Sequence, residues 1–313
     1  MNYCTIEETA KRWGITPRQV RDYCAKGRIH GARIERGVWR IPADANKPER
    51  KGRRSLPKTI HGVLDAERIS RISGGLYHQL QIDFTYNSNH IEGSRLTREQ
   101  TRWIFETKTI GEMDSSVPVD DIVETANHFR AVDNVISTAG AALTEAYIKR
   151  LHEILKSGTT DSRKQWFAVG DYKLLDNVVA DMETCPTKDV HREMAKLLAW
   201  WKNADKTFEN LIDMHVRFEQ IHPFQDGNGR IGRLILLKEC LKFGITPFII
   251  TDEMRRFYYL GLQEWRRGSR LRLMETCRMG QDLFIVGLRK FGHAKLVEKA
   301  LAEQAESEGK TMP

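Results

Sequence analysis

The sequence predicts a mainly α-helical protein with a small basic N-terminal domain and a larger helical body. Residues 1–58 carry fifteen Lys and Arg against six Asp and Glu, which leaves the other 255 residues close to neutral. From Thr59 onward, apolar residues recur at helical spacing and alternating β-branched stretches are rare. A length of 313 residues, with 40% hydrophobic and 29% charged residues, fits about two ordinary globular domains.

Two short helices are predicted at the N-terminus. Thr5 and Glu8 have the spacing of a capping box, in which each side chain satisfies a backbone amide of the other residue, and Thr16 with Gln19 repeats it. Gly14 lies between the two boxes and ends the first helix. The second helix is rich in arginine. This layout is typical of a helix-turn-helix, whose second helix enters the major groove of DNA.

A β-hairpin is predicted after the second helix, because residues 29–42 alternate with period two around a turn at 35–37. Over residues 1–45 the chain resembles the winged helix-turn-helix domains of the excisionase and MerR-like families. The resemblance implies DNA as a partner, with four side chains facing it: Arg18, Gln19, Arg21 and Arg33. The alternative is a small basic module that binds protein. Residues 46–58 are predicted to be a basic linker that can add phosphate contacts.

Cysteine spacing and hydropathy exclude several protein classes. The five cysteines lie far apart and form no C-x-x-C pair, which predicts free thiols: Cys4, Cys24, Cys185, Cys240 and Cys277. No apolar run approaches the roughly 20 residues that cross a bilayer. The first residues have neither the cationic nor the apolar segment of a leader peptide. We therefore expect a cytoplasmic protein without a membrane partner.

The helical body is predicted to span residues 59–292, followed by a polar helix or tail over 293–313. Its predicted helices include one over 62–82 and a separate one over 84–92. Between the helices of the middle third, Val178-Val179 stands among polar residues, and this pattern predicts a short hairpin.

Residues 222–233 bring together the groups that phosphate chemistry needs. They read His-Pro-Phe-Gln-Asp-Gly-Asn-Gly-Arg-Ile-Gly-Arg. The turn of Gly227, Asn228 and Gly229 opens a predicted helix, whose free amides form a nest for anions. Arg230 and Arg233 lie three residues apart and can reach further phosphate oxygens from one helical face.

Two more side chains of this segment can act on a phosphoryl group. Asp226 can hold Mg²⁺, which takes one or two protein carboxylates and completes its shell from substrate phosphates and water. His222 in its neutral form can accept a hydroxyl proton close to the same place. The segment therefore predicts a nucleotidyl- or phosphoryl-transfer site.

The same residues resemble the signature of Fic-domain proteins, H-x-F-x-D/E-G-N-G-R-x-x-R, at every defined position. The resemblance extends over about residues 60–290 and implies a Fic helical bundle with a short β-hairpin flap. It also implies an enzyme that transfers AMP from ATP to a Tyr, Ser or Thr hydroxyl of a target protein or of itself. Related Doc-type kinases carry a lysine in the glycine-rich turn, where this chain has Gly229, so AMP transfer is favoured.

The resemblance also implies a role for each residue of the signature. His222 would take the proton of the attacking hydroxyl, and Asp226 would bind the metal. The amides of residues 227–229, helped by the asparagine side chain, would hold the α- and β-phosphates. Arg230 would pair with the β-phosphate and Arg233 with the γ-phosphate. The phenylalanine two residues after the histidine would anchor the loop.

An inhibitory element is expected near residues 84–93. Ser88, Glu92 and Gly93 fit the Fic inhibitory motif S/T-x-x-x-E-G/N, placed before the core as in the class with an N-terminal inhibitory helix. In that family the glutamate pairs with the second arginine of the signature, here Arg233. The alternative is an exposed glutamate at the end of a helix, where the dipole disfavours a carboxylate that has no cation.

Two tyrosines and several functional alternatives complete the sequence-based expectations. Tyr258 and Tyr259 resemble the adenine-side helix of the family; the alternative is that they belong to the core. The first hypothesis is an autoinhibited protein adenylyltransferase with a DNA-binding head. The second is a transcriptional regulator whose Fic body responds to nucleotide with little catalysis. A donor other than ATP and a homo-oligomer are also compatible with the sequence.

Overall fold

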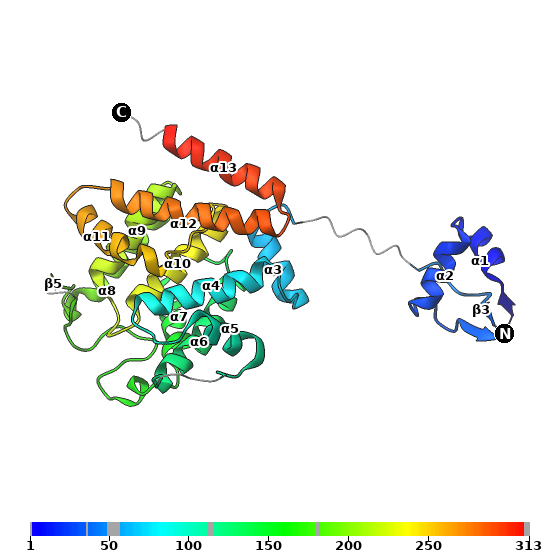
Figure 1. Ribbon diagram of the computed structural model, residues 1–313, viewed down its shortest axis with the longest axis horizontal. Helices are drawn as coiled ribbons and strands as arrows, with labels where there is room; N and C mark the ends of the chain where they lie inside the picture. Colours follow the sequence, from blue (N-terminus) through cyan, green and yellow to red (C-terminus); the bar gives the residue numbers. More distant parts are fainter. Residues whose placement is uncertain (1, 36, 49–56, 112–115, 180–181, 310–313) are drawn as a thin grey trace. The chain divides into compact units, whose positions relative to one another are not determined.

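The computed structural model describes residues 2–35, 37–48, 57–111, 116–179 and 182–309 (Figure 1). The chain divides into two compact units, Met1–Leu56 and Pro57–Pro313. Each unit has its own hydrophobic core. Most of the predicted linker, 49–56, lies outside the described residues.

The N-terminal unit packs two short helices against a small antiparallel sheet. Its elements are β1 (Tyr3–Cys4), α1 (Ile6–Trp13), α2 (Pro17–Ala25), β2 (Arg33–Glu35) and β3 (Val38–Pro42). The strand order is β1-β3-β2, so β3 lies in the middle. The core is formed by side chains from both helices, the connection after α2 and β3: Ile6, Ala10, Val20, Tyr23, Cys24, Ile29 and Ile41.

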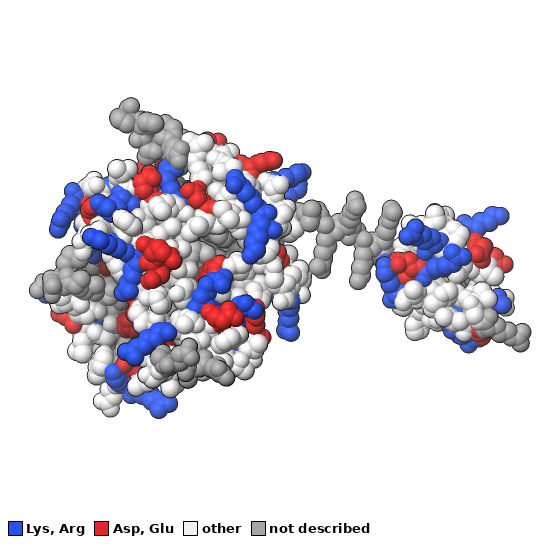
Figure 2. Space-filling model, in the orientation of Figure 1, with Lys and Arg blue, Asp and Glu red and all other residues white. Residues whose placement is uncertain are grey.

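Local signals in the sequence position these N-terminal elements as predicted. Both capping boxes form, with Thr5 and Glu8 at the start of α1 and Thr16 and Gln19 at the start of α2. Gly14 ends α1 in the left-handed conformation, at φ 63°. Strand β1 was not predicted, because two residues are too few to show a period-two pattern. Lys and Arg side chains lie on the surface of this unit, interspersed with Asp and Glu (Figure 2).

The C-terminal unit is a helical bundle. Its α-helices are α3 (Ile60–Ser70), α4 (Leu76–Ile91), α5 (Arg98–Thr107), α6 (Val119–Ser137), α7 (Glu145–Lys156), α8 (Val190–Asn203), α9 (Phe208–Ile221), α10 (Asn228–Phe243), α11 (Arg255–Arg266), α12 (Leu271–Lys290) and α13 (Ala294–Gly309). Short 3₁₀ turns cover Asp161–Arg163, Thr187–Asp189 and Asp252–Met254, and β4 (Val178–Val179) pairs with β5 (Met182–Glu183).

Helix α10 lies at the centre of this bundle. It contacts α3, α4, α6, α7 and α9, and residues on all its faces are buried. Its N-terminus therefore opens between helices that come from distant parts of the sequence. This arrangement allows α4, α6 and α7 to contribute side chains to a site at that end.

The break between the first two helices of the bundle differs from the prediction. A single helix over 62–82 and a separate one over 84–92 were expected, but α3 ends at Ser70 and α4 runs unbroken from Leu76 to Ile91. Arg71 and Gly74 both adopt positive φ between the two helices, and Gly75 forms the N-cap of α4. The glycine pair at 74–75 carried this signal, because glycine adopts such backbone conformations at little cost.

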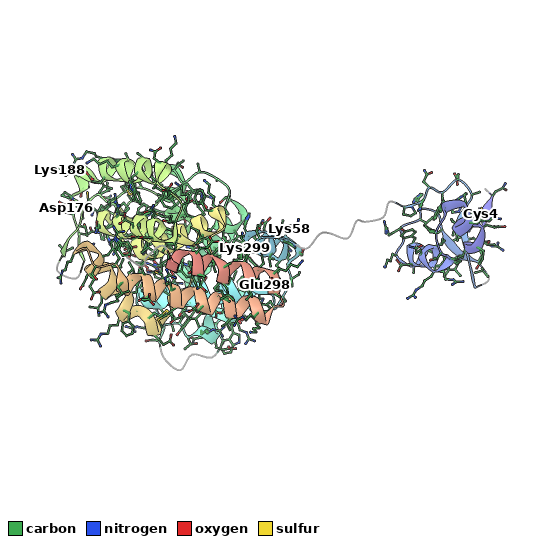
Figure 3. All side chains as sticks on the ribbon, turned by 90° about the horizontal axis from the view of Figure 1, so that it is seen from above. Cys4, Lys58, Asp176, Lys188, Glu298 and Lys299 are labelled. Carbon is green, nitrogen blue, oxygen red and sulfur yellow. The ribbon has the colours of Figure 1, made fainter. Side chains whose placement is uncertain are left out.

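The polar C-terminal segment is part of the bundle rather than a solvated tail. Helix α13 contacts α12 and buries an apolar stripe of Leu296, Val297 and Ala300. Glu298 and Lys299 are also on this helix (Figure 3). The boundary predicted at residue 292 therefore separates two helices of the same unit. Residues 310–313 lie outside the described part of the chain.

Two global expectations can be compared with the structure. All five cysteines are free, and Cys24, Cys240 and Cys277 are buried. Among the described residues, no helix has both the length and the apolar character needed to cross a membrane.

Candidate active site at the N-terminus of α10

The predicted site is a tight loop between α9 and α10. Helix α9 ends at Ile221, and His222 then adopts a left-handed conformation with φ 50°. Gly227 has φ 85°, and α10 begins at the next residue. A side chain at Gly227 would bring strain from this φ and a Cβ 3.3 Å from Leu155. The loop therefore depends on glycine where the chain turns into α10.

A buried aromatic residue and an asparagine close this loop. Phe224 is completely buried, as the resemblance implied, and its ring stacks on that of His152 with centroids 4.0 Å apart. The side chain of Asn228 accepts a hydrogen bond from the Phe224 amide and donates one to the Phe224 carbonyl, both at 2.8 Å. Asn228 was expected to help hold phosphates through its side chain. In the structure that side chain stabilises the loop, and its contact with phosphate stays a prediction.

His222 lies half-buried at the opening of the loop. Burial, and then the charge of Lys173, lower the pKa of His222 to about 4. The imidazole is therefore neutral at physiological pH and can accept a proton.

Asp226 is ionised and remains partly accessible, with 49% of its side chain exposed. Burial opposes ionisation, but the charges of Arg230 and Lys156 hold the pKa of this carboxyl below its usual value. Among the described residues, no group of three or more His, Cys, Asp or Glu side chains could hold a metal ion. A single ionised carboxylate beside an amide nest fits Mg²⁺ that arrives with nucleotide phosphates, and does not fit an all-protein metal cage.

Arg233 is held by residues at the end of α4. Its Nε donates to Ser88 Oγ at 3.0 Å, and its terminal nitrogen NH2 donates to the Ser88 carbonyl at 2.8 Å and to Glu92 Oε1 at 2.7 Å. Arg233 itself is only 3% exposed. Gly93 follows Glu92 with φ 96° and ends the helical path. The ion pair predicted between Glu92 and Arg233 is therefore present.

The carboxylate of Glu92 also lies directly against the first turn of α10. A Cβ placed on Gly229 would be only 2.2 Å from Glu92 Oε1. A side chain at position 229 would therefore displace the Glu92 carboxylate from this place. A carboxylate is favoured here because the helix N-terminus presents free amides and the positive end of the dipole. Glu92 thus occupies a place suited to an anion.

Arg230 and Arg233 point toward different helices, although the sequence suggested a shared face. Arg230 is buried and pairs with Glu124 of α6 and with Asp226, whose Oδ2 lies 3.2 Å from its NH2. Arg233 faces α4 instead. The helix supplies both guanidinium groups at its N-terminal end, and each already has a carboxylate partner.

Helix α7 contributes two residues that the sequence analysis did not place in the site. His152 and Lys156 are four residues apart and face the loop together. The Nδ1 of His152 accepts a hydrogen bond from the Gly170 amide, so Nε2 carries the proton and donates to the Asp226 carbonyl at 3.2 Å. Burial lowers the pKa of His152 to about 3, which keeps the ring neutral. The i, i+4 spacing was the available signal.

The segment before the hairpin β4–β5, which was predicted from Val178-Val179, is hydrogen-bonded to the loop between α9 and α10. The amide of Lys173 donates to the Pro223 carbonyl at 2.8 Å, and Asn177 donates to the Phe224 carbonyl at 3.3 Å. The buried ammonium of Lys173 bonds Asn177 and Thr184 on either side of the hairpin. Asp176 and Lys188 mark the two ends of this region (Figure 3).

The two predicted adenine-side tyrosines occupy different environments. Tyr258 is 1% exposed and its hydroxyl lies 2.6 Å from His215 Nε2. It is therefore a core residue, as the alternative interpretation held. Tyr259 is 38% exposed, and burial followed by the charge of Glu92 raises its pKa to about 12. Of the pair, Tyr259 is the one that can line a pocket.

The residues predicted to face DNA lie at the surface of the N-terminal unit. Arg18 and Arg21 are exposed on α2, and Arg33 is exposed on β2. Arg21 lies 3.7 Å from a carboxylate of α1, and Arg33 pairs with the carboxylate of Glu35 at 2.6 Å. Gln19 uses its side-chain oxygen in the capping box of α2. Gln19 therefore has a structural role before any contact with DNA.

Comparisons with known proteins find similarity in the segment that carries this site. Residues 142–240 match the model of the Fic/DOC family. Protein adenylyltransferase Fic of Nematostella vectensis is 26% identical over 188 residues, covering 59% of this chain and 43% of that protein. The protein of the same name from Culex quinquefasciatus is 26% identical over 193 residues, covering 60% and 37%. The chain thus spans less than half the length of these two curated relatives.

Solved structures support the fold. Fic-1 from C. elegans superposes with a TM-score of 0.58 at 20% identity, over 74% of this chain and 66% of that one. A Fic domain containing signaling protein from Bacteroides thetaiotaomicron gives 0.55 at 23%, over 78% and 91%. Residues 142–240 are therefore similar in sequence to the Fic/DOC family, and the helical bundle has the fold of Fic proteins of known structure.

Proposed function

We propose that this protein is an autoinhibited protein adenylyltransferase that transfers AMP from ATP to a protein hydroxyl, its own included. The observation that carries the proposal is the position of Glu92. Its carboxylate lies against Gly229 at the N-terminus of α10 and pairs with Arg233. A carboxylate in an anion nest indicates where a phosphate of the substrate would bind. The names of the curated relatives agree with this activity.

The reaction follows from the groups around the nest. Neutral His222 takes the proton of a Tyr, Ser or Thr hydroxyl, and the oxygen attacks the α-phosphorus of ATP. The bond from the α-phosphorus to the bridging oxygen breaks, and pyrophosphate leaves. Amides of residues 227–229 and the guanidinium of Arg230 neutralise charge on the phosphates. Asp226 would hold Mg²⁺, which supplies further positive charge to the phosphates.

Autoinhibition follows from competition for a single guanidinium. Arg233 would serve the γ-phosphate, but it already binds Glu92 and Ser88. A nucleotide triphosphate must displace the Glu92 carboxylate to reach both the nest and Arg233. Removing that carboxylate therefore activates the enzyme.

We also propose that the N-terminal unit binds DNA. The support is its layout of two capped helices and a hairpin, with exposed arginines on α2 and β2. The second candidate function, a DNA-binding regulator whose Fic body responds to nucleotide with little catalysis, shares this feature. DNA binding that survives His222→Ala, together with no AMP transfer by any variant, would favour that candidate.

The adenylyltransferase proposal is tested by incubating the wild type, Glu92→Gly and Glu92→Gly/His222→Ala with labelled ATP and Mg²⁺. We expect incorporation of AMP to rise in Glu92→Gly and to disappear in the double variant. Label transferred from the γ-phosphate would identify a kinase instead. Incubation with each nucleoside triphosphate in turn tests whether ATP is the donor.

A further inference from the structure

Four charged side chains form a cluster on the side of the loop between α9 and α10 that faces α6 and α7. Lys156 Nζ lies 2.6 Å from Asp226 Oδ2 and also pairs with Glu124. Arg230 contacts the same Oδ2 at 3.2 Å and also pairs with Glu124. Two cations thus share two carboxylates, and the formal charge of the cluster is zero. The carboxylate assigned to Mg²⁺ is therefore already neutralised by the protein.

Lys156 is fixed in this cluster. Its side chain is 3% exposed, and its stem lies beside Gly227, with Cδ 3.7 Å from a Cβ placed on that glycine. The ammonium also lies 5.4 Å from the centre of the Phe167 ring. A buried ammonium that loses its carboxylate partners is strongly destabilised. Lys156 therefore stays next to Asp226 when a ligand arrives.

We propose that Lys156 is a permanent cation of the nucleotide site that shares Asp226 with the metal ion and reduces the dependence of nucleotide binding on Mg²⁺. The inference rests on the proposed function, because it takes Asp226 and the nest as the nucleotide site. Without metal, Lys156 provides positive charge next to the diphosphate. With metal, Lys156 repels a second cation on the same carboxylate, and Glu124 opposes that repulsion. Lys156 thus acts through its charge, on the diphosphate when no metal is bound and through Asp226 when metal is bound.

The quantity that tests this inference is the dissociation constant of ADP in excess EDTA divided by its dissociation constant in saturating Mg²⁺. Both constants are measured by isothermal titration calorimetry on the full chain. ADP is the probe because it carries the two phosphates assigned to the nest; competition from Glu92 lowers its affinity in both titrations and cancels in the ratio. A general loss of affinity affects both titrations and cancels in the ratio, so a purely structural effect does not change it.

Three variants give distinct expectations. Lys156→Met removes a cation and should raise the ratio about tenfold, which corresponds to about one pKa unit of charge interaction. Glu124→Gln removes the opposing carboxylate and should lower the ratio by a similar factor. The double variant restores a neutral cluster and should return the ratio to within about threefold of wild type. Lys156→Arg keeps the charge and serves as the matched control.

The outcomes separate this inference from the proposed function. A ratio in Lys156→Met within twofold of wild type, or a shift of both single variants in the same direction, overturns the role of Lys156. If Lys156→Met does not fold, as judged by circular dichroism, the decrease expected for Glu124→Gln decides alone. ADP binding without AMP transfer refutes the adenylyltransferase activity but leaves this test intact. Absence of ADP binding by Glu92→Gly under both conditions refutes both proposals.

Discussion

Replacing Glu92 with glycine is the perturbation whose size the structure defines best. Arg233 is 3% exposed and donates three hydrogen bonds, one of them to the Glu92 carboxylate at 2.7 Å. A charge-assisted hydrogen bond of this kind contributes about 1.5–3 kcal/mol. An incoming γ-phosphate must offset that contribution in the wild type. Without Glu92, AMP transfer should therefore be about 10- to 150-fold faster, because 1.4 kcal/mol corresponds to a factor of ten.

The assay is the initial rate of AMP incorporation from labelled ATP at a fixed Mg²⁺ concentration. Glu92→Gln is the matched control, because an amide of the same size keeps a neutral hydrogen bond and should give an intermediate rate. Ser88→Ala removes the hydrogen bond from Arg233 Nε to an uncharged hydroxyl and should give about a two- to tenfold increase. Equal rates for wild type and Glu92→Gly would refute the competition for Arg233.

Three further predictions concern the base, the loop and the N-terminal unit. The pKa of His222 is lowered to about 4. The kcat/KM of Glu92→Gly should therefore stay constant between about pH 6 and 8 and fall only near pH 4. A fall centred near pH 6.5, the ordinary pKa of histidine, would contradict this role. Asn228→Ala loses two hydrogen bonds to the buried backbone of Phe224. The free energy of unfolding, measured in urea, should therefore drop by about 2–4 kcal/mol. An unchanged unfolding midpoint would show that Asn228 does not stabilise the loop. Arg18→Ala should weaken duplex DNA binding and reduce the slope of log K against log salt concentration by about one. His222→Ala is the control and should leave the affinity and the slope unchanged. An unaltered slope in Arg18→Ala would show that Arg18 does not contact DNA.

Much of the fold was predictable because its signals are local. The capping boxes of Thr5 and Thr16 and the left-handed Gly14 depend on neighbours within a few residues. The signal for the loop around Phe224 is also local, because its glycines and its buried aromatic residue are only a few residues apart. The break between α3 and α4 was missed because the apolar spacing continues across it, although the glycine pair at 74–75 marked the place.

The parts of the site that were missed depend on contacts between distant segments. Glu124 lies about a hundred residues before Arg230, and no pattern near either residue predicts their pairing. Lys156 shares a helical face with His152, but the sequence does not show that α7 packs beside the loop between α9 and α10. Only that packing brings both side chains into contact with Asp226. Tyr258 and Tyr259 show the same limit, because neighbouring residues on one helix differ in burial according to what packs on each side.

The most direct test of the central claim is intact-protein mass spectrometry of Glu92→Gly after incubation with ATP and Mg²⁺. The structure places a neutral base, an ionised carboxylate and an anion nest at the same end of α10. The account predicts a mass gain of one AMP per modified hydroxyl, which disappears when His222→Ala is added. A gain of one phosphate, or a gain of AMP that persists in the double variant, would contradict it.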